Sequence, residues 1–411
     1  MNMKKSLVKS LSLLAATAVC AMGFTGCGNS TANTSANTSE ATTDGASDTT
    51  AEASTDAASE EAPANTGDVY KIGGMGPLTG DAASYGNSVK QGAEIAINEI
   101  NAAGGVNGHN LELVFEDDEC DEEKAISAYN KVMDEGVIAI LGAVTSGCSV
   151  AVGGESVNDG ILQITPSGSA QECTDGDNAF RICFTDPLQG QTMAKYICEQ
   201  GYKNVAIIYD AASDYSKGIT DAFVAEAGNV GLGIAAQESF NTGDVDFKTQ
   251  LTKIKDSGAD CLFLPLYYTE VGYISEQAAT LGISLPYFGS DGWDGIIAQL
   301  NGDTTNIEGA TFLTPFVATD EAENIKSFVS AYEAAYSATP DQFAADSYDG
   351  IYAIKAAIEQ CGDDVTNENL VAAMTKISIN GLTGDMTFTA EGEPNKSAKV
   401  AVIENGQYVA K

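Results

Sequence analysis

The chain has 411 residues, of which 44% are hydrophobic and 8% aromatic, so it can bury a large core and is long enough for two domains. Its 58 acidic residues outnumber the 20 Lys and Arg residues and give a formal net charge of −38, which excludes binding to nucleic acid or to an anionic membrane surface. His109 and Arg181 are the only residues of their types, so a multi-histidine metal site is excluded and a histidine-dependent triad has one candidate.

The first segment has the features of an export signal. Lys4, Lys5 and Lys9 precede an apolar stretch over 11–24, and small residues then lead to Cys27. The apolar stretch is shorter than the roughly 20 residues that cross a bilayer as a helix. We therefore expect residues 1–27 to be a signal peptide and not a membrane span.

Cys27 follows Gly26 and resembles the lipobox cysteine of bacterial lipoproteins, which is diacylated and becomes the mature N-terminus. Phe24 stands where that pattern prefers Leu, and an ordinary signal with cleavage but no lipid is the alternative. Cys20 is a poorer candidate because the bulky Val19 precedes it. The resemblance predicts a lipid anchor at Cys27.

Residues 28–67 are predicted to form a disordered acidic tether. Between 28 and 66 there is no Val, Ile, Leu, Met or aromatic residue. Such a composition cannot bury enough surface to offset the entropy of ordering the chain.

From Asp68 onward, short apolar runs alternate with helical patterns, which is typical of β-α-β units and a parallel sheet. In chain order, the expected elements are a strand at 69–73, helix 84–103, strand 111–115, helix 122–135, strand 137–141, helix 148–158, strand 161–164, helix 188–200, strand 205–209, helix 216–229, strand 233–239, helix 246–257, strand 260–264 and helix 270–281. A strand near Leu313, helices over 321–337 and 342–360, and short strands around 386–388 and 400–402 complete the chain. The pattern predicts an α/β fold with two Rossmann-like lobes.

Ligands of open parallel sheets bind beyond the C-terminal ends of the strands, so a binding site is expected in the loops that follow the strands. The loop 73–80 is rich in glycine but lacks the spacing of a dinucleotide or phosphate-binding motif. The loops 142–147 and 165–169 place Ser and Thr hydroxyls and free N–H groups at helix starts, which suits a small carboxylate. Plain N-capping by these residues is the alternative.

The body from Val69 to Lys411 resembles the leucine/isoleucine/valine-binding proteins, which are substrate-binding subunits of branched-chain amino-acid ABC transporters. The segments that carry the resemblance are 72–80, Gly86 with 92–93, 100–108, 117–121, 180–190 and 347–350. The resemblance implies a type I periplasmic binding protein, in which a three-stranded hinge joins two lobes that close over one amino acid. It implies that 68–186 plus 314–380 form lobe 1 and that 187–313 plus 381–411 form lobe 2.

The resemblance also implies a set of ligand-binding residues. The loops after the third and fourth strands would hold the ligand carboxylate, which assigns this role to Ser146, Ser167 and Ser169. Asp291 would hold the α-ammonium group, although the compared relatives carry the longer Glu at this position. Charge-assisted hydrogen bonds of this kind contribute roughly 1.5–3 kcal/mol each.

Four tyrosines are expected to form aromatic walls of this site, although ordinary half-buried packing is the better explanation for any one of them taken alone. They are Tyr85, Tyr215, Tyr267 and Tyr348. Trp293 is expected either at the border of the cleft or in rim packing. Arg181 is expected to form a structural salt bridge to an acid such as Asp186, and His109 to occupy a turn.

Seven cysteines follow the signal region, and the resemblance implies a disulfide near the third strand. We predict a Cys120–Cys148 bridge and a Cys173–Cys183 bridge. The others are expected to be buried thiols.

Three classes of function were compared. The leading hypothesis is an extracytoplasmic binding protein, anchored to the membrane only by its lipid, that delivers an amino acid to an ABC permease and ATPase complex. A sensor domain of the same fold, or binding of a polar amino acid or amide, is the alternative. An enzyme is not expected, since the chain lacks HExxH, Cys-x-x-Cys and Gly-x-Ser-x-Gly motifs. No cofactor, metal or nucleic-acid partner is expected, and the protein is expected to be a monomer.

Overall fold

The computed structural model describes residues 67–411. The predicted signal peptide (1–27), its lipidation residue Cys27 and the tether up to residue 66 lie outside the described residues. Within 67–411, none of the helices combines the length and hydropathy needed to cross a membrane.

Lobe 1 contains a parallel sheet of five strands in the order β2-β1-β3-β4-β5. Its strands are β1 (Tyr70–Gly76), β2 (Leu111–Asp117), β3 (Ala139–Leu141), β4 (Leu162–Thr165) and β5 (Ala179–Arg181). The helices of this lobe are α1 (Ala83–Ala102), α2 (Glu122–Asp134), α3 (Ser146–Asp159), η1 (Gln171–Thr174), α9 (Glu323–Tyr336), α10 (Gln342–Cys361) and α11 (Asn367–Met374).

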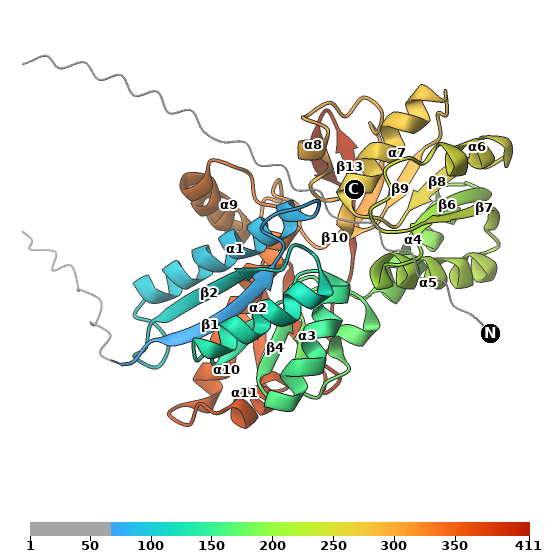
Figure 1. Cartoon of the computed structure of the whole chain (residues 1–411). Helices are drawn as coiled ribbons and strands as arrows, with labels where there is room; N and C mark the ends of the chain where they lie inside the picture. Colours follow the sequence, from blue (N-terminus) through green and yellow to red (C-terminus); the bar gives the residue numbers. More distant parts are fainter. Residues whose placement is uncertain (1–66) are drawn as a thin grey trace, which may run out of the picture. The chain divides into compact units, whose positions relative to one another are not determined.

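Helices cover both faces of this sheet, as expected for strands that are buried along their length. One core unites strand residues such as Ile72 and Ile164 with α1, α10 and α11, and a second unites Met75 and Ile140 with α2 and α3. Figure 1 shows the sheet between these two helical layers.

Lobe 2 contains a mixed sheet of seven strands in the order β14-β13-β10-β9-β8-β6-β7. Its strands are β6 (Asn204–Asp210), β7 (Gly233–Phe240), β8 (Cys261–Leu264), β9 (Tyr287–Gly289), β10 (Thr311–Thr314), β13 (Lys399–Glu404) and β14 (Gln407–Ala410). Its helices are α4 (Asp186–Glu199), α5 (Asp214–Val230), α6 (Lys248–Asp256), α7 (Tyr268–Thr280), η2 (Asp291–Trp293) and α8 (Ile296–Gln299). The strands from β6 to β10 are parallel, whereas β13 and β14 are antiparallel additions at one edge.

The chain passes between the lobes three times, and we call these connections the three crossovers. They are the segments between β5 and α4, between β10 and α9, and between the hairpin strand β12 (Gly384–Thr387) and β13. The three connections confirm the fold that the resemblance implied.

The hairpin of β11 (Ser378–Gly381) and β12 corrects one expected lobe boundary. Ile379, Met386 and Phe388 pack in the core of lobe 1 together with the strands β1, β3 and β4. The expected division between 380 and 381 is therefore wrong, and the third crossover follows Phe388. The rings of Phe388 and Phe180 lie 6.2 Å apart, which ties the hairpin to β5.

Two helix pairs approach so closely that only glycine fits. A Cβ on Gly92 of α1 would lie 2.0 Å from the Ala344 carbonyl oxygen of α10. A Cβ on Gly190 of α4 would lie 2.5 Å from the Ile219 carbonyl oxygen of α5. Such backbone contact fixes the position of helices that carry site residues.

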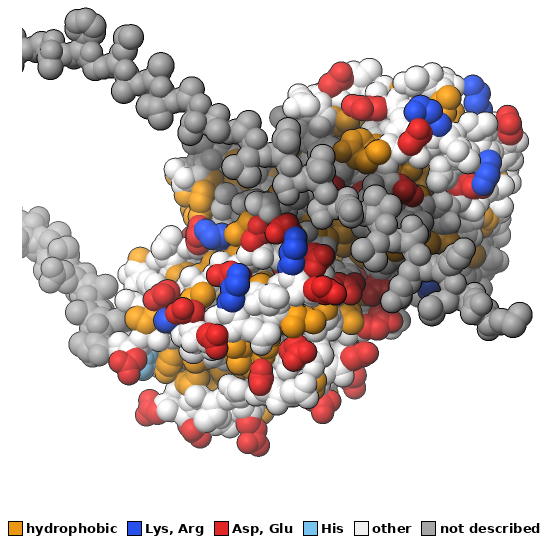
Figure 2. Space-filling view, in the orientation of Figure 1, with side chains coloured by type: hydrophobic (Ala, Val, Ile, Leu, Met, Phe, Trp, Pro, Cys, Tyr) orange, Lys and Arg blue, Asp and Glu red, His pale blue; other side chains and the backbone are white. Residues whose placement is uncertain are grey.

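Acidic side chains are spread over the face of the molecule seen in Figure 2, and fewer basic ones lie among them. Exposed ion pairs such as Lys124 with Glu119, at 2.7 Å, contribute about 0–1 kcal/mol each. These pairs therefore add little to the stability of the fold.

Candidate ligand-binding site

A small, tightly closed cavity with a volume of about 10 Å³ lies between loops of the two lobes. It is lined by Tyr85, Val144, Thr145, Ser167, Tyr215, Tyr267, Asp291, Gly292 and Phe343. Most of these residues follow the C-terminal ends of β3, β4, β8 and β9, where parallel sheets place their ligands. A wider groove shares Thr145, Tyr215 and Tyr267 with the cavity and so offers a route to it.

The two hydroxyl-rich loops of lobe 1 are hydrogen-bonded to each other. Ser146 Oγ accepts from the N–H groups of Ser169 and Ala170, each at 3.2 Å. Ser167 Oγ donates to the Val144 carbonyl at 2.7 Å. Because its oxygen acts as acceptor for both N–H groups, the Ser146 hydroxyl keeps its proton for a ligand at the start of α3.

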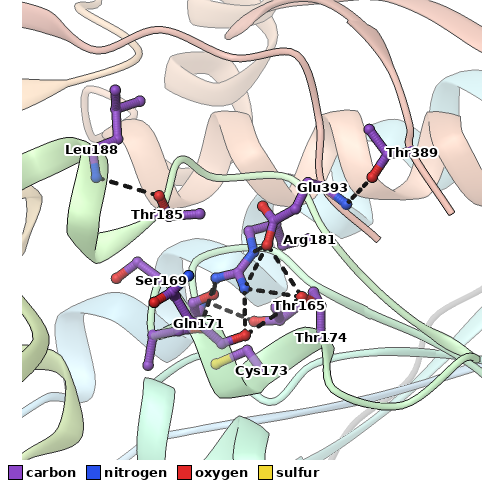
Figure 3. A network of polar contacts seen from close by, with 12 residues as sticks. Thr165, Ser169, Gln171, Cys173, Thr174, Arg181, Thr185, Leu188, Thr389 and Glu393 are labelled. Carbon is purple, nitrogen blue, oxygen red and sulfur yellow. Dashed lines mark hydrogen bonds and ion pairs between the residues drawn. The ribbon is translucent and has the colours of Figure 1, made fainter. Parts of the chain in front are cut away.

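The Arg181 guanidinium group is hydrogen-bonded to the backbone of the loop that carries Ser167 and Ser169. Its Nη1 donates to the carbonyls of Gly168 and Ala170, both at 2.8 Å. Its other N–H groups bind the Gln171 carbonyl, Thr174 Oγ1 and the carboxylate of Glu393 in the third crossover. Figure 3 shows this network, with Ser169 beside it.

The arrangement confirms that Arg181 has a structural role but corrects its partner. The ion pair is to Glu393 at 3.0 Å, whereas Asp186 is not bonded to Arg181. All five guanidinium donors are used within the protein, so none is left for a ligand.

Asp291 is the acidic group of the cavity and comes from lobe 2. Its Oδ1 accepts from the Tyr215 hydroxyl at 2.6 Å, and its backbone N–H donates to Gln189 Oε1 at 3.0 Å. Gln342 Nε2 donates to its carbonyl at 2.6 Å, which links this turn to α10. Burial raises the pKa of the Asp291 carboxyl to about 6, and the hydrogen bond from Tyr215 acts against this rise.

The aromatic walls form one packed cluster that joins the lobes. Tyr85 of α1 donates to the Gly292 carbonyl at 2.5 Å, and its ring lies 4.3 Å from that of Phe343 and 5.3 Å from that of Tyr267. The rings of Tyr215 and Tyr267 stack at 4.8 Å. Burial raises the pKa of Tyr85, Tyr215 and Tyr267 well above 10, so their hydroxyls stay protonated and can donate.

Five of the eight expected ligand-binding residues line the cavity: Tyr85, Ser167, Tyr215, Tyr267 and Asp291. Ser146 and Ser169 lie beside it in the bonded loops. Tyr348 lies elsewhere, because its side chain points from α10 toward α1: its hydroxyl donates to Glu99 at 2.6 Å and its ring packs against Phe328. The expectation that Tyr348 forms a wall of the site is therefore wrong.

Phe343 is the aromatic wall that sequence reasoning missed, and it comes from the first turn of the same helix α10. Gln189 was also missed, although it belongs to a segment that carried the family resemblance. Only their spatial position identifies them, since a Phe at a helix start and a Gln within a helix are ordinary residues.

Neither predicted disulfide is formed, because all four cysteines are free thiols. Cys120 contacts Thr145 Oγ1 at 3.6 Å, and a hydrogen bond with the Cys148 thiol is the main cause that lowers the pKa of Cys120. The two thiols are thus neighbours but form no disulfide bond. The Cys173 thiol instead donates to the Ser146 carbonyl at 3.7 Å.

The remaining single residues have structural positions. His109 lies in a turn, bridged to Val106, and stacks on Tyr70 at 4.3 Å, which confirms the turn assignment. Trp293 is fully buried and its Nε1 donates to the Leu264 carbonyl at 2.8 Å, so it belongs to the core of lobe 2 and not to a rim.

Two parallel-sheet lobes with a cavity between their strand-end loops define the class of two-lobed solute-binding proteins. The chain belongs to the periplasmic binding protein family, whose sequence pattern it matches over residues 69–407, in the branch that includes branched-chain amino-acid-binding proteins. The proteins of this family bind solutes and are not catalytic, which confirms the expectation that the chain is not an enzyme.

Characterised relatives show how far this similarity extends. The leucine-, isoleucine-, valine-, threonine- and alanine-binding protein of Pseudomonas aeruginosa is 31% identical over 79% of this chain and 87% of its own length. The branched-chain amino acid transporter substrate-binding protein LivJ of Streptococcus pneumoniae, solved in complex with isoleucine, is 32% identical with a TM-score of 0.77 over 84% of this chain and 100% of its own. A leucine-binding protein LivK of Thermotoga maritima is 29% identical with a TM-score of 0.78 over 84% of this chain and 98% of its own.

Proposed function

We propose that this protein is the lipid-anchored substrate-binding subunit of an ABC importer and that it captures a branched-chain amino acid between its lobes. The observation that carries the proposal is that the Ser146 and Ser169 hydroxyls of lobe 1, whose protons are not used within the described chain, lie on the opposite side of an aromatic cavity from one carboxylate, Asp291, of lobe 2. The relatives named for leucine, isoleucine and valine support this ligand class.

Each end of a zwitterion then meets a complementary group. The loops of Ser146, Ser167 and Ser169 hold the carboxylate, and Asp291 holds the ammonium group. Tyr85, Tyr215, Tyr267 and Phe343 enclose the aliphatic side chain with their ring faces. Closure of lobe 1 (68–186 with 314 to the hairpin) on lobe 2 (187–313 with the C-terminal strands) completes the cavity.

A panel of single amino acids titrated into the purified protein by calorimetry tests the ligand. We expect a micromolar Kd, about −8 kcal/mol, for at least one of Leu, Ile and Val. If only a polar amino acid or an amide binds, the ligand class is that compound and not a branched-chain amino acid. If no amino acid of the panel binds, the proposal is contradicted.

Mass spectrometry of the mature protein tests the anchor. We expect an N-terminus at a diacylated Cys27, and a Cys27→Ala variant released from the membrane. Delivery requires an ABC permease with its ATPase, so cells that lack the cognate permease should bind the amino acid but not import it.

A further inference from the structure

A second, larger cavity lies between the lobes and shares no lining residue with the candidate ligand-binding cavity. Its volume is about 810 Å³, which is in the range of sites that hold small organic molecules. Lobe 1 contributes α1, α9 and the loop before α10, and lobe 2 contributes α8 and the turn between β13 and β14. The second crossover forms a further wall over 316–319. We call this space the α8–α9 cavity.

Part of the wall of the α8–α9 cavity is apolar. The apolar side chains there include Ile297, Phe316, Val317, Ala318 and Val329. Phe316 belongs to a core of lobe 1, whereas Ala318 and Val329 are only partly buried against that core. An occupant with an apolar body would therefore remove further apolar surface from water.

The charged part of the wall is acidic. Asp294 of lobe 2, Asp341 of lobe 1 and Glu333 of α9 line the cavity, and no Lys, Arg or His of the described chain does so. Asp294 is 3% exposed, and a buried carboxylate without a cation is unfavourable. Burial raises the pKa of Asp294 well above its usual value, and the Asp341 carboxyl adds to the rise. A positively charged group complements this wall.

The two aspartates belong to the wall that separates the two cavities. The Gln342 backbone N–H donates to Asp294 Oδ2 at 3.1 Å, and Gln342 Nε2 donates to the Asp291 carbonyl at 2.6 Å. These bonds join the start of α10 in lobe 1 to the η2 turn of lobe 2. On the other side of this wall, Asp291 and Phe343 line the ligand cavity. A cation that neutralises Asp294 and Asp341 would stabilise this contact between the lobes.

We propose that the α8–α9 cavity binds an amphiphilic organic cation. Asp294 and Asp341 bind its amine group, and the second crossover and α9 cover its apolar part. A protonated amine supplies both the N–H donors and the positive charge that the lining lacks.

Occupation of this cavity is coupled to capture of the amino acid. Because its walls come from both lobes, the cation favours the arrangement in which they are joined, and by linkage each ligand strengthens the binding of the other. The site itself does not depend on the proposed function, whereas this coupling rests on it.

Calorimetry with two probes of the same shape tests the site. 3-Phenylpropylamine is cationic, and 3-phenyl-1-propanol carries a neutral hydroxyl group in place of the amine. Both are titrated into the full-length protein with leucine in excess, at pH 8, where Asp341 is ionised because burial raises its pKa only to about 6. We expect a Kd below about 1 mM for the amine and binding at least tenfold weaker for the alcohol. With the amine in excess, the Kd of leucine should fall at least threefold.

Two variants and a matched control locate the bound amine. Asp294→Asn keeps an acceptor for the Gln342 N–H but removes the charge, so it should weaken the amine at least tenfold and leave the alcohol unchanged. Asp134→Asn removes an exposed charge at the end of α2 and should change neither probe, which separates the site from general attraction to the net charge of −38. Ala318→Leu fills the apolar part and should weaken both probes at least fivefold, and it supplies the test if Asp294→Asn does not fold by circular dichroism.

The outcomes separate the site, the coupling and the proposed function. No binding of the amine, or equal affinity for the amine and the alcohol, overturns the site. Equal weakening of the amine in Asp294→Asn and Asp134→Asn overturns it as well. Binding of the amine without a change in the Kd of leucine overturns the coupling alone. If no amino acid binds to the wild-type protein, the proposed function and the coupling are overturned, and the result for the amine stands.

Discussion

The crossover region and the ligand cavity both bury charged side chains, but they differ in how these charges are neutralised. In the crossovers, the Lys396 ammonium donates to the Ile182 carbonyl at 2.7 Å, to Asp346 Oδ1 at 2.9 Å and to Thr383 Oγ1 at 2.5 Å. Lys396 and Asp346 are each 2% exposed, and every ammonium proton has an acceptor. In the cavity, the Asp291 carboxylate accepts from the Tyr215 hydroxyl at 2.6 Å and has no ion-pair partner among the described residues.

The crossover bonds join segments that lie far apart in the chain. Ile182 follows β5, Asp346 belongs to α10 after the second crossover, and Lys396 lies in the third. Asp349 of α10 adds bonds to the backbone N–H groups of Leu382 and Thr383, at 2.8 and 3.0 Å. The crossovers are thus held by a buried charge that the chain itself neutralises, whereas the cavity carboxylate is left without a cation within the described residues.

Lys396→Met should have the largest effect, because it leaves Asp346 buried without its cation. We expect the free energy of unfolding in urea to fall by about 3–5 kcal/mol. Lys399→Met is the control, since its pair with Asp320 is 3.6 Å long and exposed, and it should change stability by less than about 0.5 kcal/mol. Equal losses in the free energy of unfolding in both variants would show that the Lys396–Asp346 ion pair stabilises the fold no more than an exposed pair does.

Asp291→Asn should come next, because it removes the charge assigned to the ligand ammonium and keeps the shape of the side chain. Calorimetry should show amino-acid affinity reduced about 10- to 100-fold, matching roughly 1.5–3 kcal/mol for a charge-assisted hydrogen bond. The circular dichroism spectrum should be unchanged. Wild-type affinity in this variant would mean that the ammonium group binds elsewhere.

The same carboxyl group should make the stability of the unliganded protein depend on pH. Burial raises the pKa of Asp291 to about 6, so between about pH 4 and pH 6 the folded state holds a proton that the unfolded state has lost. Its contribution to stability is therefore present below pH 4 and is lost as the pH rises through 6. The free energy of unfolding of the wild type, relative to Asp291→Asn, should fall by roughly 3 kcal/mol across this range, measured by urea unfolding at each pH. The same pH dependence of stability in both proteins would contradict this.

Tyr348→Phe should have the smallest effect on ligand affinity. It tests whether Tyr348 forms a wall of the site, as the sequence predicted, or lies outside the site, as in the structure. It removes a hydroxyl bonded to Glu99 in lobe 1, so ligand affinity should stay within twofold of the wild type. Phe343→Ala on the same helix should weaken binding more, since Phe343 lines the cavity. Calorimetry with the same amino acid compares the two variants directly.

The repeating pattern of strands and helices predicted most of the fold, because each long element buries one periodic apolar face. The three-residue strands β5 and β9 escaped prediction because so short a run carries no periodicity, whereas β3, of the same length, ends a longer apolar run over 137–141. The expected lobe boundary split the hairpin β11–β12 between the lobes because the packing that ties the hairpin to lobe 1, Phe388 on Phe180, joins residues more than two hundred positions apart.

The loops at the strand ends predicted the carboxylate side of the site because Ser and Thr hydroxyls at helix starts are visible in the sequence. The family resemblance added Asp291 and the tyrosines. Tyr348 and Phe343 lie in the same helix, and only the direction in which each side chain points decides which of them meets the cavity. The pairing of Lys396 with Asp346 across the crossovers is a tertiary contact with no local pattern.

The threading of the chain through three crossovers also decides the order in which the molecule can fold. The five-stranded sheet of lobe 1 is complete at Arg181, but α10 and α11, which cover one face of that sheet, begin only at Gln342 and Asn367. All strands of the lobe 2 sheet except β13 and β14 lie in the chain between Arg181 and Gln342. Pairing so distant in sequence is slow, and the apolar face of the first sheet stays open until the late helices arrive. We therefore expect the sheet of lobe 1 to gain its full helical cover only after most of the chain of lobe 2 has been made.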